Sequence, residues 1–580
     1  MAKQSIFKTK PWLLPFVISA SIYLVLASFS IRKPLSGDEV YDLEEVRTYT
    51  RGTYDKIDIL GQDITFTHVP LYPLFLSFLS RLFGENLFLF RSVGLLTLCS
   101  VLFLLSFFPF RILRDPAWAK RVSWIAPLLV ATHPVSVQGS AILDYESTFF
   151  LLFLSLFCFF WLTSTLSIRS LSGLSFLYAL CLWGRSGSAL ILPIAWGVWA
   201  IFMRPQKKEV ISLGAVLLGG LLIFILSWGL FVYFIWGSGH FFKPFAYLFD
   251  RVGSAGNLSS YSLQDRIQDL ARFLIWFGVP WLLLLIVSFV KGIPKSLSHF
   301  EGRLHFLKAL LFFGIPVYHV LGRSSWGYPK YLTPFAPLAT FFFTVLTTEK
   351  WPSFRGREGL SLFFLSAVIG LSSFLLIGDP LYELCYGLKK SLVMGSTLLQ
   401  EFPRLLWIFG LPTLFLFMSL FLTTRWFKKG TDFSPTWPLG CALALFATQL
   451  PFALVQAHAP YPTTAMYGDE KRGEVIEILK KRVQPTEFIL ASELVIPYEA
   501  GSTVTHLRMR KFPWENPASF LQILREKSPK AVVYSVSTLS LHSYREVVQN
   551  PEVQETLSRD FSKTVFGDYV LWLRKEASFP

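Results

Sequence analysis

Long apolar runs alternate with short polar segments along most of the chain. A run of about 20 apolar residues is long enough for an α-helix to cross the hydrocarbon core of a membrane. Runs of this kind lie near residues 11–31, 87–110, 122–138, 147–166, 170–184, 187–203, 210–236, 271–290, 306–321, 331–348, 359–378, 404–424 and 437–456. The pattern therefore predicts a polytopic α-helical membrane protein with about 13 transmembrane helices.

A polar stretch, residues 36–86, separates the first two apolar runs. Near its start, Val40, Leu43 and Val46 recur at helical spacing, and Asp38, Asp42 and Glu45 share another face of the same helix. An apolar stripe beside a charged face is typical of a helix that lies on a membrane surface. The stretch is therefore predicted to form interfacial helices in a loop of the transmembrane domain, which spans residues 1–456.

The pattern changes after the last apolar run. Residues 457–580 are mostly polar, and their apolar segments are short. Periodicity predicts helices at 474–482 and 518–526, strands at 487–491 and 531–535, and a strand-like segment at 565–573. This C-terminal region is predicted to be a soluble α/β domain that caps the outer face of the membrane.

Composition and charge support a membrane protein and give its orientation. The 580 residues are 53% hydrophobic and 17% aromatic, and the mean hydropathy is +0.48, which excludes an ordinary soluble chain. The net charge of +16 comes from Lys and Arg clusters in alternate loops, a pattern that indicates cytoplasmic loops rather than nucleic-acid binding. The N-terminus is then cytoplasmic, and the C-terminal domain lies outside. Five cysteines without CxxC spacing indicate neither a disulfide framework nor a zinc site.

Two acidic segments are predicted on the outer side. Asp38 and Glu39 follow the first apolar run, and Asp144 and Glu146 follow the third. The first pair also fits the N-terminal turn of an interfacial helix, where acids are favoured by the helix dipole. The second segment also fits a simple polar turn. If the two loops converge, their carboxylates provide the base and the acceptor-orienting group that sugar transfer to a hydroxyl or amine requires.

Four basic residues are predicted on the same side. They are His68, Arg185, Arg323 and Lys330. Each is also consistent with a residue whose charged end extends from an apolar segment to the membrane surface. Together they are candidates for an anion site that holds a phosphate leaving group.

These motifs, in this order, resemble the GT-C class of polyprenyl-phosphate-dependent glycosyltransferases. The resemblance rests on Asp38-Glu39, on the segment from His68 to Tyr72, on the segment from Gly139 to Asp144, and on residues 328–337 before a late apolar run. The most similar members in pattern are the lipid A aminoarabinose transferases and bacterial enzymes like the protein O-mannosyltransferases. The resemblance covers most of the chain.

The resemblance implies a membrane glycosyltransferase of the bacterial inner membrane that takes a sugar from a polyprenyl-phosphate donor with inversion. It implies catalytic roles for Asp38, Asp144 and Glu39, and donor-phosphate binding by His68, with Arg185, Arg323 and Lys330 beside it. Glu146 and Tyr41 are expected to bind the acceptor, which is a lipid, a glycan or a protein. Some members bind a divalent metal ion through an acid at the position of Thr67, so metal dependence stays open.

Two other classes of function are compatible with a polytopic chain. A transporter, or a flippase or polymerase of lipid-linked glycans, would be expected to carry ionisable residues in mid-span and helices broken in paired halves. The apolar runs here are nearly free of charge. A structural assembly factor would be expected to tolerate the loss of Asp38. No motif names the sugar or the acceptor.

Overall fold

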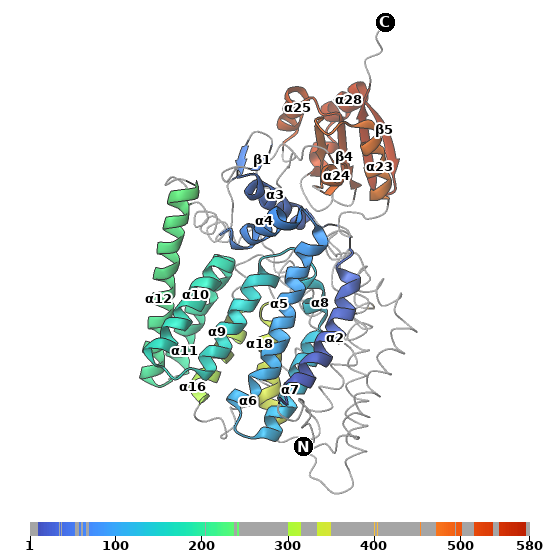
Figure 1. Cartoon of the computed structure of the whole chain (residues 1–580). Helices are drawn as coiled ribbons and strands as arrows, with labels where there is room; N and C mark the ends of the chain where they lie inside the picture. The colour runs from blue at the N-terminus through green and yellow to red at the C-terminus, as the bar shows by residue number, and fades with distance from the viewer. Residues whose placement is uncertain are drawn as a thin grey trace, which may run out of the picture. The chain divides into compact units, whose positions relative to one another are not determined.

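The computed structural model of the chain describes most of its N-terminal half and most of its C-terminal domain (Figure 1). Apart from a few isolated positions, the described residues are 10–33, 37–52, 57–59, 62–64, 69–203, 205–236, 300–314, 333–349, 471–493, 495–501, 516–536 and 544–575. They divide into two compact units. The first holds the described residues of Met1–Arg32, Thr67–Lys389 and Thr397–Ala459, and the second holds those of Lys33–Phe66, Lys390–Ser396 and Pro460–Pro580.

Helices make up the first unit. In chain order they are α2 Leu13–Ser30, α4 Leu71–Phe83, α5 Leu87–Phe107, α6 Pro109–Ile112, α7 Pro116–Ala131, α8 Pro134–Ser140, the π-helical segment η1 Glu146–Phe150, α9 Leu151–Thr163, α10 Ile168–Ala189, α11 Ile191–Phe202, α12 Lys207–Phe231, η2 Val232–Trp236, α16 Glu301–Ala309, η6 Leu310–Gly314 and α18 Ala336–Thr348. Capping residues in the sequence determine where several of these helices begin. Asn86 caps α5 by accepting hydrogen bonds from two backbone N–H groups, and Asp115 caps α7, whose first residue is Pro116.

Several predicted membrane spans are present as apolar helices. Among the described residues, Leu13–Ser30, Leu87–Ile112 and Lys207–Ile235 are long and apolar enough to cross a membrane. The runs predicted near 170–184 and 187–203 form α10 and α11, a pair bent by 83°. The runs near 271–290, 359–378, 404–424 and 437–456 lie outside the described residues, so the total of about 13 spans stays a prediction.

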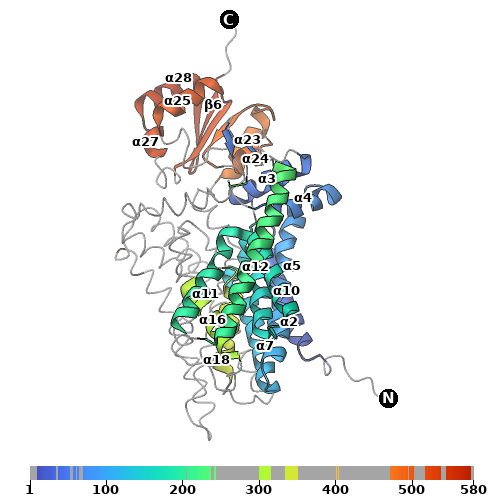
Figure 2. The ribbon, with the colours of Figure 1, turned by 90° about the vertical axis from the view of Figure 1, so that its left-hand side faces the viewer.

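Small residues allow the helices of this unit to approach closely. A Cβ atom on Gly94 of α5 would overlap the backbone carbonyl of Ser140 in α8, and a Cβ on Gly220 of α12 would lie 2.5 Å from the carbonyl oxygen of Ser175 in α10. Glycine brings helix backbones together in membrane proteins, where apolar burial alone does not drive helices to associate. As a result α10 and α12 pack side by side (Figures 1 and 2).

The second unit contains the helix α3 and the C-terminal domain. Its elements are α3 Gly37–Arg51, β1 Ile57–Ile59, β2 Gln62–Ile64, α23 Arg472–Arg482, β3 Ile489–Ala491, α24 Val495–Glu499, α25 Pro517–Glu526, β4 Ala531–Ser535, α27 Tyr544–Val548, α28 Pro551–Asp560, β5 Phe561–Phe566 and β6 Tyr569–Arg574. The helix predicted at the start of the polar stretch is confirmed as α3. Its Val40, Leu43 and Val46 are buried within the protein.

The C-terminal domain is the small α/β unit that the sequence predicts. Its four-stranded sheet has the order β3-β4-β6-β5, with β3 and β4 parallel and the other pairs antiparallel. Alternate residues of β4 face two different cores: Val532 and Tyr534 pack with α25, α27 and α28, and Ala531 and Val533 pack with α23 and α24. Figure 2 shows the helices on the two sides of the sheet. The strand-like segment predicted at 565–573 spans parts of two strands, because a turn at Gly567, with φ of 53°, separates β5 from β6.

Candidate active site

Two tyrosines and an arginine stack together at one end of the helical unit. The rings of Tyr72 and Tyr145 have their centroids 5.6 Å apart in an edge-to-face arrangement. The guanidinium carbon of Arg185 lies 5.5 Å from the centroid of the Tyr145 ring. Tyr72 comes from the first turn of α4, Tyr145 precedes η1, and Arg185 lies in α10. The stack therefore joins three of the segments that the sequence singles out as candidates.

Asp144 lies directly before Tyr145 in this cluster. Its side chain is buried, with 3% of its surface exposed. Its backbone carbonyl accepts a hydrogen bond of 2.7 Å from the Thr148 hydroxyl, which holds the turn that leads into η1. A carboxylate is costly to bury unless charged or hydrogen-bonding groups surround it, so a buried acid beside an arginine and two tyrosines is a strong candidate for chemistry.

The local sequence around Arg185 explains how the arginine reaches this place. The backbone at Arg185 is extended, with φ of −162° and ψ of 91°, and it interrupts the helical pattern of α10. A Cβ atom on the preceding Gly184 would lie 3.2 Å from the backbone nitrogen of Phe150, so glycine allows α10 to approach η1 closely. Arg185 itself is half-buried. An arginine at a break between apolar helices is well placed to meet a charged group at the membrane boundary.

The other predicted residues belong to the second compact unit, to η1, or to parts of the chain that the structure does not describe. Asp38, Glu39 and Tyr41 belong to α3 in the other compact unit; Glu39 is fully buried. Glu146 lies in η1. Three basic candidates fall outside the described residues: His68, Arg323 and Lys330. Thr67 falls outside them as well. The structure thus brings together Asp144, Arg185 and the segment that follows His68, and it leaves the other assignments as predictions.

Two ionisable residues that the sequence reading missed are fully buried in the helical unit. Arg91 of α5 donates a hydrogen bond of 2.9 Å from Nη1 to the carbonyl of Ile31, at the C-terminal end of α2. His133 lies between α7 and α8. Arg91 could have been noticed in the sequence, because an ionisable residue within an apolar run is rare and needs a partner.

No metal centre is present among the residues that the structure describes. Within them, no three His, Cys, Asp or Glu side chains converge as metal ligands would. Thr67, the position that the sequence analysis connects with metal binding, is outside the described residues.

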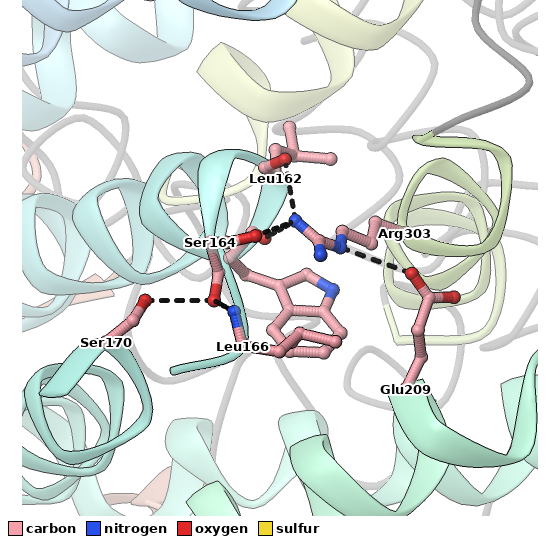
Figure 3. Close-up of polar contacts among 7 residues, drawn as sticks. Leu162, Ser164, Leu166, Ser170, Glu209 and Arg303 are labelled. Atoms are coloured by element: carbon pink, nitrogen blue, oxygen red, sulfur yellow. Dashed lines mark hydrogen bonds and ion pairs between the residues drawn. The ribbon is translucent and has the colours of Figure 1, made fainter. Parts of the chain in front are cut away.

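A second charged cluster lies at the other end of α10 (Figure 3). Arg303 of α16 donates from Nη1 to the carbonyls of Trp161, Leu162 and Ser164 at the end of α9, and from Nε to Glu209 of α12 at 3.2 Å. The end of α9 and the start of α12 therefore lie at the same end of the unit. The chain leaves this end along α10 and returns to it along α11. The loops joined here are ones that the sequence predicts to be cytoplasmic.

The chain has the fold of a polytopic α-helical membrane protein of the GT-C type, with a small C-terminal α/β domain. Solved structures with a similar fold include two of ArnT from Cupriavidus metallidurans. In complex with undecaprenyl phosphate, ArnT matches 98% of this chain over 99% of its own length, with a TM-score of 0.51 and 12% sequence identity. In the apo state it matches 97% over 98%, with a TM-score of 0.53 and 12% identity.

No family model matches the chain, and no curated protein does. The structural likeness confirms the predicted fold class, including the small sheet in the C-terminal domain.

Proposed function

We propose that the protein is a membrane glycosyltransferase that moves a sugar from a polyprenyl-phosphate donor to an acceptor outside the cytoplasm. The observation that carries the proposal is the cluster of Asp144, Tyr145, Arg185 and Tyr72, which gathers three separate segments in a fold whose solved example binds undecaprenyl phosphate. A buried acid, a half-exposed cation and aromatic rings are the groups that a sugar phosphate needs.

The chemistry is a single displacement at the anomeric carbon. Asp38 takes a proton from the acceptor hydroxyl or amine, whose lone pair forms the new bond to that carbon. The bond from the anomeric carbon to the phosphate oxygen breaks, and its electrons remain on the polyprenyl phosphate. Attack from the face opposite the leaving group inverts the configuration.

The side chains of the candidate site have different roles, in stabilising the leaving group and in orienting the acceptor. Arg185, with His68, Arg323 and Lys330, stabilises the charge that builds on the leaving phosphate. Asp144 orients the acceptor with Glu146 and Tyr41, and Glu39 supports the general base. The Tyr145 ring holds the guanidinium of Arg185 in place through a cation–π contact, and the Tyr72 ring packs against Tyr145.

The same proposal includes the place of the protein in the cell. It lies in a bacterial inner membrane with a cytoplasmic N-terminus, and the C-terminal domain faces outward. Arg303 supports this orientation, because it joins three loops that the positive-inside rule puts on one side. Cysteine introduced at the exposed Glu555 should react with an impermeant thiol reagent added outside the cell if the C-terminal domain faces outward.

The decisive experiment compares Asp38→Asn with wild type. Mass spectrometry of lipids, glycans and envelope proteins from cells with and without the gene first identifies the modified product. Asp38→Asn should then reduce its formation by roughly 10²- to 10⁴-fold, the usual contribution of a general base. Asp42→Asn, which removes a carboxylate one turn further along α3, is the matched control. A normal amount of product from Asp38→Asn would refute the assignment.

A further inference from the structure

The C-terminal domain contacts the helix that carries Asp38. Arg47 of α3 lies over the ring of Tyr498 in α24, with its guanidinium carbon 4.4 Å from the ring centroid. Arg47 also pairs with Glu44 of its own helix at 2.7 Å, which fixes the arginine on the helix surface. Both helices belong to the second compact unit. The contact therefore joins two segments that lie about 450 residues apart in the chain.

Tyr498 is anchored rigidly to the core of the C-terminal domain. Ile496, two residues earlier, is fully buried in the cluster that α23 and α24 form against the sheet. Gly501 donates a backbone hydrogen bond of 3.1 Å to the carbonyl of Tyr498, which closes the end of α24. A ring fixed in this way loses little freedom when it binds a cation.

The link continues to the edge of the sheet, at the carboxyl end of β3. Glu493 lies just before α24 and is buried between two partners: it accepts a hydrogen bond of 3.0 Å from the Tyr569 hydroxyl and lies 3.8 Å from Arg472. Tyr569 is the first residue of β6 and Arg472 the first of α23. The start of α24 is thus tied to a strand and a helix of the domain.

Helix geometry relates the contact to the proposed base. Position 47 is nine residues after position 38, a rotation of about 180° and a rise of roughly 14 Å along α3. Contact through Arg47 therefore fixes the face of α3 opposite Asp38. Holding a helix on one face sets the direction of the other, and small errors in that direction reduce transfer strongly.

We infer that the C-terminal domain positions the catalytic helix through the Tyr498–Arg47 contact, and that these two are positioning residues for the general base. The inference rests on the proposed function only in naming Asp38 as that base. It gives the C-terminal domain a role in the rate of transfer rather than in donor binding.

The test uses the full-length protein in lipid nanodiscs. Tyr498→Ala should lower the rate of product formation about 5- to 30-fold, the scale of one cation–π contact that is partly shielded from water. Affinity for undecaprenyl phosphate should stay within about twofold of wild type. Hydrogen exchange of α3 should rise by a factor similar to the loss of rate, with β4 and β6 unchanged. Tyr498→Phe, which keeps the ring, should restore all three values.

A second pair of variants keeps the inference testable if Tyr498→Ala does not fold. Arg47→Gln should reproduce the slower transfer and the faster exchange from the side of α3, and Arg47→Lys should recover part of both. Lys563→Ala is the matched control, because Lys563 makes the same kind of contact, 5.4 Å from the centroid of the Trp572 ring, but lies in β5 at the sheet edge opposite β3.

The outcomes separate the two proposals. Unchanged exchange of α3 in both Tyr498→Ala and Arg47→Gln would overturn the positioning role, even where Asp38→Asn is inactive. Faster exchange with an unchanged transfer rate would also overturn it. An active Asp38→Asn together with faster exchange in Tyr498→Ala would instead refute the proposed base and leave the contact between the domain and α3 established.

Discussion

Two arginines at opposite ends of α10 show how the same side chain serves different purposes in one helical unit. Arg303 is 8% exposed, and its guanidinium donates to three backbone carbonyls and a carboxylate. Arg185 is half-buried and stacks on the Tyr145 ring at a break in the helix. Residues 168–184 of α10, roughly 25 Å of helix, lie between them.

Exposure is the property that separates the two arginines. A fully enclosed guanidinium cannot exchange partners without unfolding part of the protein, so Arg303 serves the structure. A half-exposed guanidinium remains reachable by a phosphate, so Arg185 can serve a ligand. A basic residue next to an apolar run is therefore a candidate for a ligand site only when its side chain stays accessible.

Gly302 supports the structural role of the Arg303 end. A Cβ atom at this position would overlap the Glu209 carboxylate. Glycine before Arg303 therefore leaves room for the carboxylate in the position that the ion pair has. Trp161 adds a ring 5.4 Å below the same guanidinium, and its indole packs against Trp199 and Phe306. Packing and charge enclose the pair from several sides.

The largest effect is expected for Arg303→Ala. The substitution leaves Glu209, which is 7% exposed, without its cation, and such a loss costs about 3–5 kcal/mol of stability. Thermal unfolding of the protein in detergent should therefore begin at a clearly lower temperature. Product formation per folded molecule should stay near that of wild type. Arg303→Met combined with Glu209→Leu is the control and should regain much of the lost stability, because neither partner then remains charged.

A smaller effect, on catalysis instead of stability, is expected for Arg185→Ala. Loss of one charge-assisted contact to the leaving phosphate raises the barrier by about 2–3 kcal/mol, or roughly 30- to 150-fold in rate. Binding of undecaprenyl phosphate should weaken as well, and the unfolding temperature should change little. Arg185→Lys should keep part of the rate. An Arg185→Ala protein that binds undecaprenyl phosphate normally but unfolds early would place Arg185 in the same structural class as Arg303.

The sequence predicts the elements of this molecule better than their long-range contacts. Apolar length alone predicts α2, α5 and α12, and periodicity predicts α23, α25 and the strands β3 and β4, because these signals are local. Alternation of loops across the membrane also puts Asp144 and Arg185 on one side, and the structure does bring them together.

The contacts between distant segments could not be predicted in this way. Arg303 and Glu209 are 94 residues apart and look in the sequence like two ordinary charges in loops. The Arg47–Tyr498 contact joins α3 to a helix of the C-terminal domain and has no sequence signature. The bend of 83° between α10 and α11 is likewise not revealed by the apolar runs.

The smallest effect is expected for a third arginine pair, which is exposed. Arg559 donates to both carboxylate oxygens of Asp560, at 2.8 Å and 3.3 Å. These hydrogen bonds hold the pKa of Asp560 below its usual value. Both side chains are exposed to water, so the pair should contribute little to stability. Asp560→Asn should therefore change the unfolding temperature only slightly at neutral pH.

The pH dependence of that small difference gives the sharper test. Because the folded pKa of Asp560 is depressed, its contribution to stability is present above the unfolded pKa of about 3.9 and is lost as the pH falls through the folded pKa. Wild type and Asp560→Asn should thus differ between about pH 5 and 8 and converge in stronger acid, as measured by thermal unfolding across pH. Arg303→Ala should stay less stable than wild type over the neutral range by a much larger margin. If Asp560→Asn were as destabilising as Arg303→Ala at neutral pH, burial would not be what separates the structural arginine pair from the others.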